Sequence, residues 1–267
     1  MSNNEPLQRL IRLMQRLRDP ESGCPWDLEQ TMQSLLPHTL EEVYELADAI
    51  ECSDHQQIRE ELGDYLFQAA FYAQIASEEG LFSLADVVNG LVDKLVHRHP
   101  HVFPDGDLDG DASSSKALGK AQIKDNWETL KQKARAEKSL HSQLDDVPSA
   151  LPALQRAHKL QSRAARGGFD WPNHLGALAK LEEESAELNE AIIEQDREAM
   201  AHEAGDLLFT CVNLCRHLGV DAEQVLRGAN TRFETRFRSI ESALDSQGKK
   251  MAETELEELE ALWQQAK

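Results

Sequence analysis

The sequence predicts an all-α protein built as two tandem four-helix-type domains, joined by a linker and a connecting helix. Only 14 glycines and 9 prolines occur among 267 residues, so long stretches run without either helix breaker. The composition, 40% hydrophobic and 28% charged, is that of a globular chain. The third observation is an acidic segment that occurs twice, which makes the chain a tandem repeat.

The repeat relates residues 39–72 to residues 181–214 at a constant offset of 142 positions, without a gap. At this offset acidic residues fall on acidic residues, Gly63 falls on Gly205, and Phe67 falls on Phe209. Chance richness in acidic residues does not keep a glycine, a phenylalanine and the carboxylates in register together. The sequence therefore indicates an internal duplication.

An apolar stripe and three capping signals predict the helices of the first copy. Apolar residues from Leu7 to Leu17 recur with a 3.6-residue period. Thr39 has the spacing of a capping box with a glutamate three residues later, and Asp54 and Ser83 are residue types that cap helices. The predicted helices cover about residues 7–17, 39–50, 54–80 and 83–98.

The second copy repeats this pattern. Its corresponding helices are predicted to begin near Asn173, Asp196 and Asp221, and Gly219 is predicted to end one of them. A final helix is predicted to open at Thr254 and to reach the end of the chain.

A polar segment rich in glycine, serine and aspartate, residues 104–116, reads as a linker, and residues 120–140 are predicted to form the connecting helix. The predicted boundaries are therefore residues 1–103 for the first domain, 104–145 for the linker with its helix, and 146–267 for the second domain.

The formal net charge of −20 limits which partners the protein can bind. Such a surface repels the phosphate backbone, so we expect no nucleic-acid polymer as a partner. A small triphosphate is compatible with it, since it arrives with Mg²⁺ and meets local basic residues. No apolar run is long enough for a membrane span, and arginines interrupt the N-terminal segment where a signal peptide needs an apolar core. We therefore expect a cytoplasmic protein without a membrane partner.

Two pairs of carboxylates in each copy are spaced to share a helix face. Residues three apart on a helix project from the same side, so two antiparallel helices would bring four carboxylates together. Like charges at this density need compensation, which a divalent cation supplies, and oxygen ligands select Mg²⁺, with Mn²⁺ as an alternative. Gly63 is predicted to let the helices approach closely. The predicted ligands are Glu42, Glu45, Glu61 and Asp64 in the first copy and Glu184, Glu187, Glu203 and Asp206 in the second.

Acidic residues at this spacing are also common on solvated helix faces, and two other readings compete with the metal site. A carboxylate-bridged di-iron bundle requires Glu-x-x-His pairs, which neither acidic motif contains. The alternative that stays open is a non-enzymatic helical scaffold whose acidic faces bind a protein partner. Recurrence of the pattern, with an apolar stripe continuing through it, favours the metal site.

The motifs together resemble the MazG family. The resemblance is carried by EExxE followed by ExGD in both copies, CPWD at residues 24–27, RHPHVF at residues 98–103 and GFDW at residues 168–171. It covers nearly the whole chain. It implies two MazG-like domains, hydrolysis of a nucleoside triphosphate to the monophosphate and pyrophosphate, a requirement for Mg²⁺, a homodimer, and metal ligation by the eight carboxylates.

By this resemblance, water attacks the α-phosphorus while the metal offsets charge on the pyrophosphate leaving group. Glu183 is predicted to orient or deprotonate that water, with Glu41 as its counterpart, although either residue could instead be a ligand or a solvated neighbour. The arginines Arg232 and Arg236 would grip the triphosphate, and Trp263 would stack on the base or close the core. The residues predicted to bind substrate are Lys180, Glu183, Asp206, Arg232, Arg236 and Trp263 in the second copy, and Lys94 and Arg98 in the first.

The two copies are predicted to differ where the phosphate-facing arginines lie. Lys94 and Arg98 have the i, i+4 spacing of the second copy's arginines, but Pro100 follows at once and should end the helix there. The second copy is therefore expected to supply most of the hydrolysis, and the first to be weak or regulatory.

Overall fold

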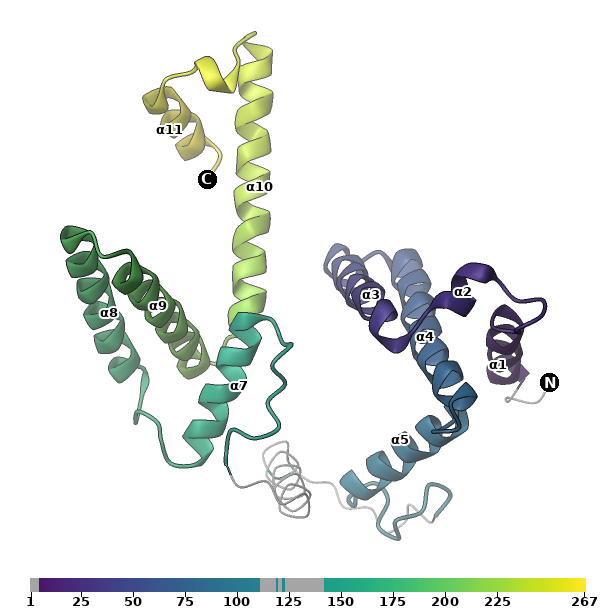
Figure 1. The fold of residues 1–267 in the computed structure, drawn as a ribbon. Helices are drawn as coiled ribbons and strands as arrows, with labels where there is room; N and C mark the ends of the chain where they lie inside the picture. The colour runs from purple at the N-terminus through teal and green to yellow at the C-terminus, as the bar shows by residue number, and fades with distance from the viewer. Residues whose placement is uncertain (1–4, 111–118, 120–121, 123–141) are drawn as a thin grey trace. The chain divides into compact units, whose positions relative to one another are not determined.

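A computed structural model of the chain describes residues 5–110, 119, 122 and 142–267 (Figure 1). All secondary structure in these residues is helical, which confirms the predicted fold class. The chain divides into two compact units, residues 1–131 and residues 132–267, and each contains one copy of the repeat. The connecting helix predicted over residues 120–140 falls almost entirely outside the described residues, and the predicted domain boundaries stay a prediction.

The first unit is an antiparallel pair of long helices, α3 and α4, with shorter helices packed at its sides (Figure 1). Helix α1 packs on α4, and its contact side is the apolar stripe that the sequence shows. The helices of this unit are α1 (Glu5–Leu17), α2 (Pro25–Glu29), α3 (Met32–Cys52), α4 (His55–Glu78) and α5 (Leu84–Arg98).

The second unit repeats the pair as α8 and α9, with α7 against α9 as α1 lies against α4 (Figure 1). Helix α10 packs on α7, α9 and α11. The helices of this unit are α7 (Ala153–Arg166), α8 (His174–Glu194), α9 (Arg197–Leu218), α10 (Ala222–Ser246), the 3₁₀ turn η2 (Met251–Glu253) and α11 (Leu256–Gln265).

Most predicted helix starts are confirmed by their capping hydrogen bonds. Asp54 and Asp196 each accept two backbone N–H bonds at the start of α4 and α9. Ser83 forms a capping box with Asp86 at the start of α5. Helix α5 ends at Arg98, before Pro100, whereas the 25-residue helix α10 continues past Arg236 to Ser246, as predicted.

Two predicted helix starts are wrong. The capping box of α3 is Thr31 with Ser34, so the helix begins a full two turns before Thr39. Thr39 lies inside the helix and donates its hydroxyl to the Leu35 carbonyl, an alternative that a mid-helix threonine commonly uses. Helix α11 begins at Leu256 rather than at Thr254, whose hydroxyl donates to the Lys250 carbonyl of the preceding turn.

The first unit has a cluster of buried core residues where α1 meets α4. Met14 and Phe71 are 1% and 0% exposed, and Leu35 and Ile75 pack in the same cluster. Arg18 lies against the Phe71 ring, 5.5 Å from its centroid, and its Nη2 is 2.7 Å from Glu78 Oε2. Within the described residues, no helix combines the length and apolar character needed to cross a membrane.

Candidate active site

The second acidic site lies between α8 and α9. The chain reverses at Gln195, whose φ of 57° ends α8, and Asp196 caps α9 at once. This tight reversal places the two helices side by side and makes their inward carboxylates neighbours (Figure 1). Glu184, Glu187 and Glu203 each offer a carboxylate oxygen within 4.8 Å of the others, and Glu184 is only 4% exposed.

Asp206, the fourth predicted ligand, joins a second group that shares Glu203. His202, Glu203 and Asp206 also offer ligand atoms within 4.8 Å of one another. His202 Nδ1 lies 3.1 Å from Asp206 Oδ2 and 3.5 Å from Glu203 Oε1. His202 could not be predicted from the repeat, because the first copy has Glu60 at the same position.

Lys180 pairs with the acidic helix itself. Its Nζ lies 2.8 Å from Glu183 Oε1 and 2.8 Å from Glu184 Oε1, and these hydrogen bonds raise the pKa of Lys180. Desolvation raises the pKa of Glu187, against the attraction of Lys180 and together with the repulsion of nearby carboxylates. Carboxylate oxygens gathered this closely repel one another when ionised, and a hard divalent cation such as Mg²⁺ or Mn²⁺ would offset that charge.

The first acidic site repeats the arrangement between α3 and α4. Glu42, Glu45 and Glu61 offer oxygens within 4.8 Å of one another. Desolvation raises the pKa of Glu42, and the charges of Asp64 and Glu45 add to it. A hollow of about 560 Å³ adjoins these side chains and is lined by Glu41, Tyr44, Glu45, Asp48, Gln57 and Glu61.

The predicted reason for the glycine in the ExGD motif is wrong. A Cβ built on Gly63 or on Gly205 meets no atom within 4 Å, so neither glycine is required for close approach of the two helices within its unit. The apolar residues around these glycines are also more exposed than a core stripe would be. Leu62, Leu66 and Leu208 are all at least half exposed.

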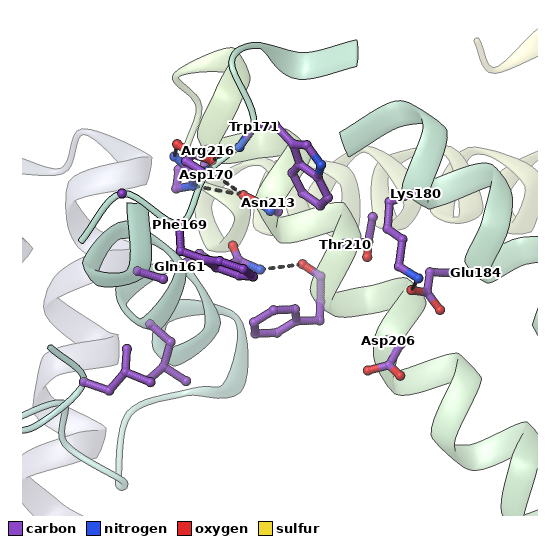
Figure 2. A pocket seen from close by; sticks show the side chains of 15 residues that line it. Gln161, Phe169, Asp170, Trp171, Lys180, Glu184, Asp206, Thr210, Asn213 and Arg216 are labelled. Atoms are coloured by element: carbon purple, nitrogen blue, oxygen red, sulfur yellow. Dashed lines mark hydrogen bonds and ion pairs between the residues drawn. The ribbon is translucent and has the colours of Figure 1, made fainter. Parts of the chain in front are cut away.

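A cavity of about 730 Å³ opens beside the second acidic site (Figure 2). Its wall combines the acidic helices with α7 and the loop between α7 and α8. Lys180, Glu184 and Asp206 lie at one side and the aromatic loop residues lie at another (Figure 2). The lining residues are Leu144, Leu160, Gln161, Ala164, Gly168, Phe169, Asp170, Trp171, Lys180, Glu184, Asp206, Phe209, Thr210, Asn213 and Arg216.

Polar contacts hold the loop wall of this cavity in place. Arg216 donates to both carboxylate oxygens of Asp170, which lowers the pKa of that group. The same guanidinium donates to Asn213 Oδ1 from Nε at 2.9 Å and from Nη2 at 2.7 Å. Gln161 Nε2 donates to the Phe209 carbonyl at 2.8 Å, so α7 is bonded directly to α9 (Figure 2).

The predicted phosphate-binding arginines, Arg232 and Arg236, do not lie at the cavity of their own unit. Arg236 stacks over the Trp263 ring at 5.4 Å from its centroid, which joins α10 to α11. Neither arginine nor Trp263 lines the cavity of about 730 Å³, whereas Lys180, Glu184 and Asp206 do. In the first unit Lys94 and Arg98 are on α5 and do not line the hollow beside Glu41 and Glu45.

Gln161, Asn213 and Arg216 were missed by the sequence analysis. Aligning the two copies of the repeat could have identified Gln161 and Asn213. Residues 7–9 and 154–156 both read LQR, and this match places Gln161 on Met14; the main offset places Asn213 on Phe71. A change from apolar to polar at two core positions of a repeat indicates that the second copy does not use them for packing.

Comparison with known proteins identifies the family of this fold and site. The model of the MazG nucleotide pyrophosphohydrolase domain matches residues 30–103 and 173–240. The nucleoside triphosphate pyrophosphohydrolase of Escherichia coli strain K12 is 47% identical over 265 residues, spanning 98% of this chain and 97% of that protein. The nucleoside triphosphate pyrophosphohydrolase/pyrophosphatase MazG of Thermotoga maritima is 40% identical over 260 residues, spanning 97% and 95%. Half of the uncharacterized protein YabN of Bacillus subtilis matches at 40% identity over 256 residues.

Proposed function

The chain belongs to the MazG family and is a nucleoside triphosphate pyrophosphohydrolase, and we propose that its second copy performs the reaction with Mg²⁺. The proposed ligands are Glu184, Glu187, Glu203 and Asp206. The observation that carries this proposal is their position: Glu184 from α8 and Asp206 from α9 line one side of a cavity of about 730 Å³, large enough for a nucleotide, and Glu187 and Glu203 cluster with Glu184.

The chain's own residues have distinct roles in the proposed reaction. The four proposed carboxylate ligands would hold Mg²⁺, and the chemistry that this ion would supply is compensation of the negative charge that develops on the pyrophosphate leaving group. Glu183 accepts the proton of the attacking water as the new bond to the α-phosphorus forms and the bond to pyrophosphate breaks. Lys180, 2.8 Å from both Glu183 and Glu184, fixes the orientation of these neighbouring carboxylates.

A homodimer would complete this site. The cations that line the cavity, among the described residues, are Lys180 and Arg216, and both are already paired with carboxylates. Arg232 and Arg236 lie on α10, away from the cavity of their own chain, and the pair α8–α9 exposes Leu208 and Ile193. We propose that a second copy covers this apolar face and brings its α10 arginines and Trp263 to the triphosphate.

The first copy is proposed to bind a cation without supplying most of the hydrolysis. Its carboxylates gather as in the second copy, but the cores beside them differ. The roles predicted for Glu41, Lys94 and Arg98 therefore belong to a copy that we propose to be weakly active or regulatory. The predicted cytoplasmic location is likewise part of the proposal.

The reaction is tested by incubating the purified chain with ATP and Mg²⁺ and separating the products. Release of AMP and pyrophosphate is expected. Release of ADP and phosphate would contradict attack at the α-phosphorus, and no release from any nucleoside triphosphate would leave the acidic protein-binding scaffold as the better account. Replacing Mg²⁺ by Mn²⁺ is expected to sustain activity, and EDTA to abolish it.

The shared site is tested by mixing two inactive chains. A chain with Arg236→Ala keeps its carboxylates, and a chain with Glu184→Gln keeps its arginines. If the site combines two copies, random reassociation restores about a quarter of the parental activity, because half of the dimers are mixed and each has one intact site. A site formed within one chain gives no recovery.

A further inference from the structure

We infer that the cavity beside the second acidic site, walled by Gln161, Trp171 and Asn213, binds the nucleobase of the triphosphate. This assignment rests on the proposed function, and it identifies the group that the site recognises beyond the phosphates. It gives base recognition to the α7–α9 interface and its adjoining loop rather than to Trp263.

The cavity has the size and polarity that a nucleoside needs. Its volume of about 730 Å³ lies within the roughly 300–1,000 Å³ typical of small-molecule pockets. The carboxylates Glu184 and Asp206 line one side, while Phe169 and Trp171 line another (Figure 2). A nucleotide with its phosphates at the carboxylates therefore directs its base toward the aromatic wall.

A buried hydrogen-bond acceptor on this wall has no donor. Gln161 is 6% exposed and lines the cavity, and its Oε1 has no hydrogen-bond partner among the described residues. The bond from Nε2 to the Phe209 carbonyl fixes which end of the amide is the oxygen, because a flipped amide would place two acceptors together. An unpaired buried acceptor is unfavourable, so a base N–H that pairs with it gains affinity. Phe169 lies beside Gln161 and is 85% exposed, so few contacts hold its ring in place (Figure 2).

Asn213 offers the complementary donor. Arg216 donates twice to Asn213 Oδ1, which leaves the Nδ2 group of this cavity-lining residue to face a ligand. An acceptor on Gln161 and a donor on Asn213 match the hydrogen-bonding edge of a nucleobase, where an N–H lies next to an acceptor. Asp170 holds Arg216 from the other side and so maintains the orientation of the amide.

The aromatic wall is positioned by a glycine. A Cβ added to Gly176 would lie 2.4 Å from Trp171 Cδ1, so only glycine at the start of α8 allows the indole to pack there. Trp171 also lies 6.4 Å from the His217 ring, measured between centroids. Aromatic side chains that line a nucleotide cavity in this way can stack on the base.

The first copy shows what the same interface does without a base to bind. Met14 and Phe71 occupy the positions of Gln161 and Asn213, and both are fully buried between α1 and α4. The acidic cluster of that copy is nevertheless retained. The polar pair in the second copy is therefore not required by the helix pairing and is explained by a ligand.

The decisive variant copies the first unit into the second, with Gln161→Met and Asn213→Phe together. We expect kcat/KM for ATP to fall by on the order of 100-fold, mainly through KM, because the base is excluded. Hydrolysis of ribose 5-triphosphate, which has no base, should be unchanged between parent and variant. Equal losses on both substrates, or unchanged kcat/KM for ATP, would overturn the assignment.

A second variant and a binding measurement separate this inference from the proposed function. Gln161→Leu removes the acceptor without filling the cavity and should lower kcat/KM for ATP about 10-fold. AMP binding is measured by calorimetry without metal, with Mn²⁺ binding to each variant as the control for folding. Loss of AMP binding in the double variant supports the base pocket even if the parent hydrolyses no triphosphate, whereas undiminished AMP binding refutes it.

Discussion

The interface between α1 and α4 and the interface between α7 and α9 descend from one repeated unit, yet they are packed differently. In the first, Met14 and Phe71 are buried in a core cluster, and the hollow beside Met14 is only about 110 Å³. In the second, Gln161 and Asn213 stand at the same positions and border a cavity of about 730 Å³. Both units keep three clustered carboxylates on the adjoining helix pair.

After a duplication, the acidic cluster and the neighbouring pocket of a nucleotide site can therefore diverge independently. Each acidic cluster consists of three carboxylates on two neighbouring helices, and the chain reverses between those helices at Ser53 or Gln195. The base pocket depends on two core positions on other helices, and one apolar side chain at each closes it. The sequence predicts that the copies differ at their phosphate-binding arginines. The base pocket is a second difference between the copies.

The largest expected effect comes from removing metal ligands in one copy at a time. Glu184→Gln with Glu187→Gln should lower kcat for ATP by on the order of 10⁴-fold, since each ligand supports charge stabilisation in the transition state. The matched pair Glu42→Gln with Glu45→Gln should keep most of the activity. Pyrophosphate release measures both, and similar losses in the two variants would end the proposed asymmetry.

Truncating a side chain should lower the free energy of unfolding far more at the α1–α4 interface than at the α7–α9 interface. Phe71→Ala should reduce the free energy of unfolding by about 3–5 kcal/mol, because the side chain is fully buried and leaves a void. Asn213→Ala should reduce it by about 1 kcal/mol, since the cavity already exists and only the bonds from Arg216 are lost. Denaturant unfolding gives both values. Equal destabilisation would show that the second cavity is not open in solution.

The aromatic wall of the second copy can be displaced by one methyl group. Gly176→Ala should move Trp171 and lower kcat/KM for ATP about 10-fold, while Mn²⁺ binding is unchanged. Gly90→Ala on α5 is the matched control, because its Cβ meets nothing within 4 Å; it should raise stability by about 0.5–1 kcal/mol. Unchanged kcat/KM in Gly176→Ala would separate the indole from substrate binding.

The smallest expected effect is a difference between the two units in how their stability depends on acidic pH. Burial works to raise the pKa of Glu78, but hydrogen bonds from Arg18 and Gln74 hold it below 4.5; the bonds from Arg216 hold the pKa of Asp170 below 3.8. Carboxyls with lowered folded pKa values stabilise fully above their unfolded values, and this contribution is lost as pH falls through the folded values.

Glu78→Gln should therefore flatten the acid dependence of the first unit below about pH 4.5, and Asp170→Asn that of the second below about pH 4. Thermal unfolding followed from pH 6 to pH 3 tests this. An unaltered slope in both variants would show that the arginine pairs do not contribute to stability in solution.

The helical class, the duplication and the two acidic clusters could be predicted from the amino-acid sequence alone. These follow from local spacing: carboxylates three apart share a helix face, and aspartates at positions 54 and 196 can cap only the helix that follows them. Such features depend on residues close in the chain, so a one-dimensional pattern is enough. Where local signals competed, as between Thr31 and Thr39 at the start of α3, the spacing alone misled the prediction.

The surroundings of each acidic cluster depend on side-chain packing and could not be predicted from the sequence. The cavity joins residues from α7, α8, α9 and the loop at Trp171, and its existence depends on how much volume Gln161 and Asn213 leave unfilled. Likewise, the glycine at position 176 has meaning only because the indole lies against it. Packing is a sum over side chains distant in sequence, and no periodicity along the chain records whether that sum fills the space or leaves room for a ligand.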